Sequence, residues 1–476
     1  MNLNKVSDFI WEIPKEGGMN VPARIYASEE LLKGIRNDKT LEQVKNITHF
    51  PGIYKYSIAL PDAHQGYGMP IGGVIALDRK KGGISPGATG YDINCGVRLI
   101  KTPLKYEEVK PKIKELVNTL FENVPSGVGV GAKINVSKEE LKEVIEKGAR
   151  WAVENGYGYE KDLEVLEENG EMEEADSSAV SEKALNRGKG QVGCLGAGNH
   201  FLEVEVVGDI KRPELAEKFG LEEGQVCLMI HTGSRGFGHQ VCTDYLRKFE
   251  KTFKDLVSEL PDRELVYAPG QSKEAEQYYK AMSCAANFAW ANRQLITHWV
   301  RESFNMVFKD VNPEEMEIIY DICHNIAKKE THEIDGEEKE VFVHRKGATR
   351  ALPPGHENVP DKYKEMGQPV LIPGDMGHGS YLLVGGDKSL DLSFGSTAHG
   401  AGRVMSRTKA KGKFWGGTVQ KDLEKQDIIV KAENMPVVAE EAPGAYKNLD
   451  EVVEVSDKLD IANVVLKLDP KGVVKG

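Results

Sequence analysis

The stretch GYDINCGVR (residues 90–98) places a carboxylate, Asp92, and a thiol, Cys95, three residues apart between glycines. Residues 97–102 have the apolar pattern of a β-strand, so the residues before them form the loop that enters it. Two ordinary interpretations are open: Asp92 caps a turn, and Cys95 is a small buried apolar residue. The third is that both side chains bind a ligand, which the glycines allow the backbone to approach closely.

Strand-like segments that end in Gly-rich loops alternate with helical segments along the chain. The segments that read as strands are 56–66, 71–78, 97–102, 200–210, 225–233, 317–325, 369–375, 380–386, 428–433 and 461–470. Those with helical spacing are 28–36, 41–47, 106–122, 138–155, 237–259 and 272–308. This interleaving predicts an α/β class with a mixed α+β arrangement. Unusual residues follow strands in both the first and the last third, so we expect one large intertwined domain over residues 1–476.

Within that domain, residues 164–190 are strongly acidic and then small and polar. They predict a solvated helical excursion or mobile insertion, part of an excursion that spans about 125–190.

The sequence contains no GxxxxGK[ST] phosphate loop, and the glycines of 193–200 are followed by a strand where a dinucleotide fold would have a helix. Neither of the two standard nucleotide-binding folds is therefore supported.

The bulk composition limits the class of protein. The chain has 476 residues and a formal charge of −12, which argues against a generic nucleic-acid coat protein but leaves room for a local basic surface. Its six cysteines form no CxxC pair, which favours a reducing compartment. The first residues lack the pattern of a signal peptide, and no apolar run reaches membrane-spanning length. We expect a cytoplasmic protein without a membrane partner.

Four histidines share one context, a strand end or Gly-rich loop beside Asn, Thr or Gly; they are His200, His231, His324 and His399. A single histidine in such a place is more often a satisfied structural residue than a ligand. Four of them, together with Asp92 and Cys95, favour a metal site built at strand ends. One thiolate, one carboxylate and three imidazoles are too many for one tetrahedral ion with an open position. Two ions that share Cys95 would use them all and leave positions for phosphate oxygens.

A local basic stretch points to a phosphate substrate. Residues 392–421 contain no Asp or Glu but hold Arg403, Arg407 and four lysines. Arg403 and Arg407 have the spacing of one helical turn, which would suit bidentate phosphate binding, although a charged helix face is an equally simple explanation. A second cluster, at 344–356, adds Arg345 and Arg350 as candidate RNA or phosphate contacts.

Seven motifs, in this order, resemble those of the RtcB family of RNA-splicing ligases. They are PDAHQGYGMPIGGV (61–74), GYDINCGVR (90–98), GAGNHFLEVE (196–205), HTGSRGFGHQ (231–240), CHNIAKKE (323–330), HRKGATRALPPGH (344–356) and GSTAHGAGRVMSR (395–407). The C-terminal KGVVKG also fits, so the resemblance covers essentially the whole chain. It implies ligation of RNA 2′,3′-cyclic phosphate or 3′-phosphate ends to 5′-hydroxyl ends, in tRNA splicing and RNA repair, with GTP and two Mn²⁺ ions.

The resemblance also implies roles for individual residues. Asp92 and His200 would hold one manganese ion, His231 and His324 the other, and Cys95 would bridge them. His399 would be the catalytic nucleophile that accepts GMP. The guanylate site would comprise Asn199, His200, Phe201, Leu202, Glu203, His324, Asn325, Pro373, Gly374, Asp375, Met376, Ser380, His399, Gly400, Ala401, Gly402 and Lys475. A monomer, tRNA halves as substrate and an archease-like activator are further expectations.

The sequence leaves two positions and two rival functions open. Asp375 stands where many relatives carry a small hydroxyl residue, and Cys323, next to His324, is expected to be a buried packing residue. One rival is a binuclear phosphodiesterase that opens cyclic phosphates without ligation and needs no His399. The other is a non-catalytic RNA- or nucleotide-binding module that needs no Cys95. The ligand set alone does not choose manganese, because it also suits zinc and cobalt.

Overall fold

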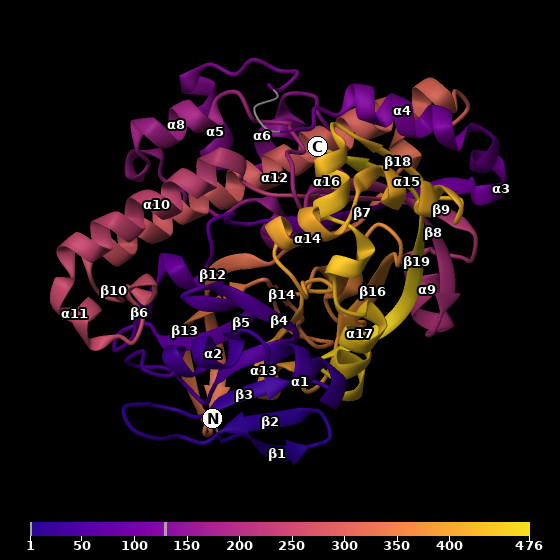
Figure 1. Cartoon of the computed structure of the whole chain (residues 1–476). Coiled ribbons are helices and arrows are strands. Elements are labelled where there is room, and N and C mark those ends of the chain that lie inside the picture. Colours follow the sequence, from indigo (N-terminus) through magenta and orange to yellow (C-terminus); the bar gives the residue numbers. More distant parts are fainter. Residues whose placement is uncertain (1, 128–130) are drawn as a thin grey trace.

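The computed structural model describes residues 2–127 and 131–476 and contains two large β-sheets (Figure 1). The first has eight strands within the described residues. Its order is β11 (Ile318–Cys323), β7 (Gly96–Lys105), β9 (Gln225–Thr232), β8 (Phe201–Ile210), β19 (Ala462–Lys475), β16 (Ser380–Gly385) and β15 (Pro369–Pro373), with β18 (Ile429–Ala432) parallel to β19. The other neighbours are antiparallel. Strands from the first, middle and last parts of the chain thus share one sheet.

The second large sheet has seven strands among the described residues. Its order is β1 (Asn4–Ser7), β2 (Ile10–Ile13), β3 (Ala23–Tyr26), β4 (Ser57–Tyr67), β5 (Met69–Asp78), β13 (Glu337–Lys346) and β12 (Asn325–Ile334). Figure 1 shows it in the lower part of the view, with the eight-stranded sheet on the right. Only His324 separates β11 of one sheet from β12 of the other, so this residue lies where the two sheets meet.

Two short pairs complete the strands. β14 (Ala348–Arg350) pairs with β17 (Ser396–Ala398), and β6 (Gly83–Ile84) pairs with β10 (Ala268–Pro269). Because β17 ends at Ala398, the first pair fixes the backbone just before His399.

The longest helix, α12 (Lys273–Val307), is buried along most of its length and packs against β9 and α10 (Arg235–Thr252). The remaining helices are α1 (Glu29–Ile35), α2 (Thr40–Ile47), α3 (Tyr106–Val109), α4 (Ile113–Asn123), α5 (Lys138–Lys147), α6 (Ala149–Glu154), α7 (Glu160–Leu163), α8 (Glu182–Gly188), α9 (Pro213–Phe219), α11 (Lys254–Glu259), α13 (Ser389–Ser393), α14 (Arg407–Lys413), α15 (Gly416–Glu424), α16 (Met435–Glu440) and α17 (Leu449–Lys458). Among the described residues, no helix has the length and apolar character needed to cross a bilayer.

The predicted mixed α/β class, with candidate metal ligands at strand ends, is confirmed. Several boundaries differ. The helix predicted over 138–155 is interrupted at Gly148, whose φ of 59° is the left-handed conformation that glycine tolerates. The strand predicted over 317–325 is two strands, one in each sheet. The N-terminal strands β1–β3 and the β12–β13 hairpin were not predicted.

The acidic segment is only partly solvated, which corrects the prediction for 164–190. Glu167 is 1% exposed and lies 2.6 Å from the Nζ atom of Lys328, and its Oε2 atom accepts a hydrogen bond from the backbone of Cys323. Glu168 pairs with Lys328 and Arg350. These carboxylates attach the segment to the strands on either side of His324, so part of its charge is structural.

Candidate two-metal and nucleotide site

Strand register brings four predicted ligands to one end of the eight-stranded sheet. Gly96 of β7 pairs with Cys323 of β11 and with Thr232 of β9, and His231 of β9 pairs with Phe201 of β8. Cys95, His200 and His324 each adjoin one of these paired residues in the chain. Antiparallel pairing therefore gathers residues that are up to 229 positions apart in the chain, a separation that sequence spacing does not reveal.

The loop before β7 is held tightly in place. The backbone N–H of Cys95 donates to the carbonyl of Asp92 at 3.0 Å, and Asn94 adopts a φ of 52°. The N–H of Asn94 donates to the carbonyl of Asn325, and the N–H of His324 donates to the carbonyl of Cys95. The loop is thereby bonded to the junction of the two sheets, which places Asp92 and Cys95 beside His324.

A buried ionic network supports this end of the sheet. Asp321 is fully buried and pairs with both Arg98 and Arg293 at 2.8 Å. Arg293, on α12, also donates to the backbone carbonyls of Asn94 and Thr232, each at 2.9 Å. One guanidinium thus joins the loop that carries Cys95 to the strand end that carries His231, and a neutral side chain of the same volume could not satisfy these acceptors.

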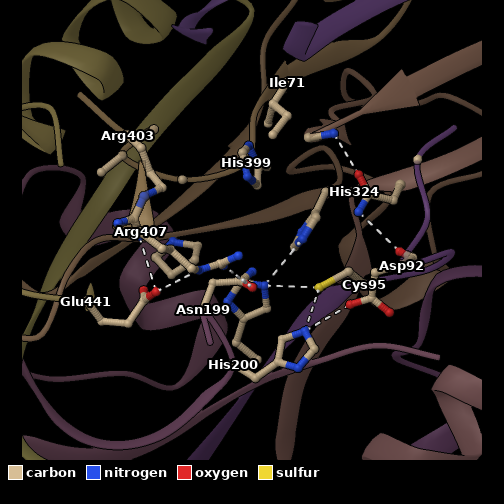
Figure 2. Close-up of a pocket in the computed structure, with 18 of the residues that line it drawn as sticks. Ile71, Asp92, Cys95, Asn199, His200, His324, His399, Arg403, Arg407 and Glu441 are labelled. Carbon is tan, nitrogen blue, oxygen red and sulfur yellow. Dashed lines mark hydrogen bonds and ion pairs between the residues drawn. The ribbon is translucent and has the colours of Figure 1, made fainter. Parts of the chain in front are cut away.

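The candidate ligand atoms form two groups that share Cys95. Asp92, Cys95 and His200 make one group, and Cys95, His231 and His324 make the other; within each group the atoms lie within 4.8 Å of one another. The Sγ atom of Cys95 is 3.4 Å from Nε2 of His200 and 3.3 Å from Nε2 of His231. Figure 2 shows Asp92, His200 and His324 around the sulfur of Cys95.

The chemistry of this donor set fits two divalent cations. Burial lowers the pKa of His231 and His324 well below the ordinary value, so both imidazoles are neutral and able to donate a lone pair. Burial, with Asp92 nearby, raises the pKa of Cys95 well above that of an ordinary thiol. A bound cation would reverse that effect and stabilise the thiolate. The residues of each group are therefore compatible with a bound metal ion.

His399 lies next to these groups and is oriented by a buried carboxylate. Its ring centroid is 4.8 Å from that of His324. The Oδ2 atom of Asp62, on β4, accepts hydrogen bonds from the backbone N–H of His399 at 3.0 Å and from its Nδ1 at 2.6 Å. In the neutral tautomer that donates from Nδ1 to this carboxylate, the lone pair of the ring is on Nε2. At Gly402, with a φ of 73°, an added Cβ would lie 2.1 Å from the carbonyl oxygen of Asp62, so only glycine allows this loop to cross β4.

One cavity of about 990 Å³ contains His399 and both ligand groups. The wall of this cavity also contains Glu203, Asp375 and Lys475. Burial raises the pKa of Glu203 and lowers that of Lys475, although the two are close enough to interact. A carboxyl and an ammonium group held in a buried wall can read the polar edge of a planar ring.

Comparison with known proteins identifies the family of this chain. The family model described as "tRNA-splicing ligase RtcB" matches residues 43–476. The chain belongs to the RtcB family. A protein named tRNA-splicing ligase RtcB from Thermococcus kodakarensis is 56% identical over 476 residues, which cover 100% of this chain and 99% of the relative. Proteins of the same name from Nanoarchaeum equitans and Methanococcus maripaludis are each 52% identical, over 100% of this chain and 100% and 99% of their own lengths.

Most residues of the expected RtcB guanylate site line the cavity, and two do not. Those in the wall are Asn199, His200, Phe201, Glu203, His324, Asn325, Pro373, Gly374, Asp375, Met376, His399, Gly400, Ala401, Gly402 and Lys475. Leu202 is not part of the cavity wall. Side chains alternate along β8, so Leu202 points away from the cavity, whereas Phe201 and Glu203 point into it. Ser380 is fully buried on β16, outside the wall.

Asp375, the departure noted in the sequence, has local partners. It is 6% exposed, and its carboxylate accepts hydrogen bonds from the backbone N–H of Gly377 and from Nδ1 of His378. Hydrogen bonding to this carboxylate raises the pKa of His378. Asp375 therefore closes its own turn at the cavity wall. Cys323 is 1% exposed, as expected for a packing residue.

Arg403 and Arg407 line the cavity, but they do not lie on the same helix. α14 begins only at Arg407, so the predicted one-turn spacing is wrong. Both guanidiniums instead meet at Oε1 of Glu441, at 3.2 Å and 3.1 Å (Figure 2). Arg407 also donates to Oδ1 of Asn199 at 3.0 Å, and its side chain is 45% exposed. Arg403 donates to the carbonyls of Met405 and Glu440, so it holds the backbone together.

Arg345 and Arg350 are outside the cavity wall, and the structure corrects their assignment as phosphate contacts. Arg345 is 1% exposed and forms a bidentate pair with Glu330. Arg350 is 3% exposed and pairs with Glu168. Arg345 neutralises Glu330, whose side chain is 8% exposed, and Arg350 also lies 3.4 Å from the fully buried carboxylate of Glu167. These partners are too distant in sequence to be recognised from local spacing.

Sequence reasoning assigned no role to several polar residues in the wall. They are His64, two residues after Asp62, and, farther along the chain, Arg187, Arg235 and His239. Asp62 itself, beneath the wall, was also missed. Arg235 lies 2.6 Å from Nδ1 of His200, and an added Cβ at Gly196 would collide with its guanidinium. Arg235 and His239 occur in the HTGSRGFGHQ motif, which was the available signal for them.

Proposed function

We propose that the chain is a GTP- and manganese-dependent RNA ligase that joins 2′,3′-cyclic phosphate or 3′-phosphate ends to 5′-hydroxyl ends. Membership of the RtcB family supports the reaction class. The observation that carries the proposal is the position of His399: it has one ring nitrogen bonded to Asp62 and lies in the same cavity as two candidate metal-ligand groups. Neither a simple hydrolase nor a binding module needs a nucleophile positioned in this way.

Asp92 and His200 would hold one ion, His231 and His324 the other, and Cys95 both. When bound, two divalent cations would withdraw charge from phosphate oxygens and align attacking and leaving oxygens. Manganese is the family expectation, whereas the donor set also suits zinc and cobalt. The protein's own contribution is to hold five donors on rigid strand ends and joining loops, with neutral imidazoles among them.

In the first step, Nε2 of His399 attacks the α-phosphorus of GTP. The new bond is N–P, the bond that breaks joins the α-phosphorus to the bridging oxygen, and pyrophosphate leaves. Asp62 keeps the proton on Nδ1 and stabilises the positive charge that develops on the ring. GMP is then attached to His399 as a phosphoramidate.

RNA enters in the later steps. Water opens a cyclic phosphate end to a 3′-phosphate, whose oxygen attacks the phosphorus of the His399 adduct and releases the imidazole. The RNA then carries GMP on its 3′-phosphate. The 5′-hydroxyl of the second strand attacks the RNA phosphorus, a phosphodiester forms and GMP leaves. Holding all reacting groups in one cavity turns these encounters into steps within a single complex.

Glu203 and Lys475, in the cavity wall, would bind the guanylate. An ionised Glu203 can accept hydrogen bonds from guanine N–H groups, and Lys475 can donate to the guanine carbonyl. The cavity also collects cationic side chains in an acidic chain; they are Arg187, Arg235, Lys346, Arg403, Arg407 and Lys475. Such a local positive field attracts polyanions despite the formal charge of −12.

A ligation assay tests the proposal. Two short RNAs, one with a 2′,3′-cyclic phosphate and one with a 5′-hydroxyl, are incubated with protein, GTP and MnCl₂. We expect a joined product that needs GTP and is absent with His399→Ala. Opening of the cyclic phosphate without any joining would instead support the binuclear phosphodiesterase. As part of the proposal, the enzyme acts on tRNA halves in the cytoplasm as a monomer, with an archease-like activator raising its turnover.

A further inference from the structure

An aromatic cluster lies in the cavity wall and takes no part in the steps above. It consists of Tyr67, Tyr91 and His239, all of which line the cavity. The rings of Tyr67 and Tyr91 meet edge to face with centroids 6.4 Å apart, and those of Tyr91 and His239 are stacked with centroids 6.0 Å apart. The three residues come from β4, from the loop that carries Asp92 and from α10. We call these three residues the aromatic platform.

The outermost ring is unusually exposed. Tyr67 is 68% exposed, and His239 is also exposed, while Tyr91 beneath them is half-buried. Large exposed apolar groups in a soluble protein tend to mark contact sites, particularly where they adjoin a cavity. Tyr91 lies directly before the candidate metal ligand Asp92 in the chain, so the platform adjoins the reacting centre.

The backbone beneath Tyr67 is rigidly held, so its exposure does not reflect a loose loop. The side chain of the buried Gln43 donates to the carbonyl of Gly66 and accepts from its N–H. The N–H of Gln65 donates to Asp38, and the buried ammonium group of Lys346 donates to the carbonyl of Tyr67. Every residue from 65 to 67 thus has a backbone group bonded to a side chain from elsewhere. A rigid backbone that presents an exposed ring costs little further entropy when a partner stacks on it.

Cationic groups lie beside the platform. Arg235 and Arg187 both line the cavity and are close enough to His239 to lower its pKa. Stacked aromatic rings beside guanidiniums are the combination that binds single-stranded RNA, because the rings receive bases while the cations receive phosphates. Every base has a π face, so such a contact tolerates different sequences.

We propose that the aromatic platform stacks the terminal nucleobase of an RNA end and so positions that end at the metal site. This inference rests on the proposed function for the identity of the substrate, but the contact itself is independent of ligation. Its ligand is an unpaired terminal base, which either the 3′-phosphate strand or the 5′-hydroxyl strand can supply.

Equilibrium binding tests the platform without requiring turnover. Fluorescently labelled RNAs are prepared in two series, one with a 3′-phosphate end and one with a 5′-hydroxyl end, each with a natural or an abasic terminal nucleotide. Wild type should bind one series roughly tenfold more weakly when the terminal base is missing, in line with one stacked base. The series that shows this loss identifies the strand whose base is stacked.

Variants isolate the ring. Tyr67→Ala should weaken binding of that natural RNA by the same roughly tenfold factor and cause no further loss with the abasic RNA. Tyr67→Phe should restore tight binding, because stacking needs the ring and not the hydroxyl. Trp415→Ala is the matched control: Trp415 is 70% exposed but outside the cavity wall, and its removal should leave the base dependence intact.

Equal affinity of wild type for natural and abasic RNA in both series would overturn the proposal. The proposal would also be overturned if the losses of affinity caused by Tyr67→Ala and by the abasic nucleotide multiplied when combined. That result would mean that Tyr67 does not contact the terminal base, and it would indicate a surface for another partner, such as a protein. Failure of ligation by wild type with base-dependent binding preserved would count against the proposed function alone. The two ideas therefore fail separately.

Discussion

The Nδ1 atom of His399 lies 2.6 Å from the Oδ2 atom of Asp62, a residue 337 positions earlier in the chain. The same oxygen also accepts the backbone N–H of His399, so ring and backbone are fixed by one carboxylate. Asp62 is fully buried, and it can act on the reaction only through the histidine. In the proposed reaction Asp62 is therefore a positioning residue, which holds the proton on Nδ1 and leaves Nε2 to attack.

Replacing that carboxylate should slow attachment of GMP to His399. We expect Asp62→Asn to reduce the single-turnover rate of adduct formation by roughly 10²- to 10⁴-fold, because the amide removes the charge that stabilises the developing imidazolium. The measurement is the rate at which label from GTP is incorporated into protein. Metal content should stay at the wild-type value, and an unchanged rate of incorporation would show that Asp62 does not orient His399.

Cys95 is the only residue common to both ligand groups among the described residues, so its loss should affect both ions. We expect Cys95→Ala to bind fewer than two manganese ions per chain, measured by elemental analysis after gel filtration. Cys227→Ala is the matched control, since Cys227 is equally buried on the strand that carries His231 but belongs to neither group. Wild-type stoichiometry in Cys95→Ala would contradict the shared-thiolate arrangement.

Part of this site was predictable from the sequence. Asp92, Cys95 and three histidines stood out because each follows or precedes a strand in a Gly-rich context, and the resemblance to RtcB gave them roles. Asp62 was missed because nothing local links it to His399. Arg345 and Arg350 were misassigned because their partners, Glu330 and Glu168, come from other strands and turns.

The same limits apply to the fold. The pattern of apolar residues predicted a strand at each of the eight strands that the described residues contribute to the eight-stranded sheet. It missed β1 because that strand is exposed along its whole length and has no apolar face to bury. Residues 403–407 have the spacing of a helical turn, yet Gly402 and the bonds of Arg403 to backbone carbonyls hold them as a loop.

Arg403 and Arg407 should differ in function despite their shared partner Glu441. Arg407→Ala is expected to weaken RNA binding and to reduce the slope of log affinity against log salt by about one, as for loss of one phosphate contact. Arg403→Ala should instead lower thermal stability, because Arg403 joins two backbone carbonyls. Binding isotherms at several salt concentrations and melting curves separate the two effects. A salt-independent loss in Arg407→Ala would contradict a phosphate contact.

GTP affinity should depend on pH through Glu203. Burial raises the pKa of Glu203 above its usual 4.5, while Lys475 opposes that rise and Asp375 adds to it. Without nucleotide the carboxyl is therefore protonated to a higher pH than usual, and guanine N–H donors bind the ionised form. Because the pKa of Glu203 without nucleotide is about 8, affinity should increase with pH up to about 8 and level off above it. Titration calorimetry on wild type and Glu203→Gln checks this, and the same increase in both proteins would exclude Glu203 as its source.

Attachment of GMP to His399 is the central claim, and one measurement tests it directly. The protein is incubated with α-labelled GTP and MnCl₂, denatured and examined for retained label, with His399→Ala in parallel. We predict label on wild type only, released by mild acid as expected of a phosphoramidate. Absence of label from wild type with metal bound, or equal labelling of His399→Ala, would contradict the account.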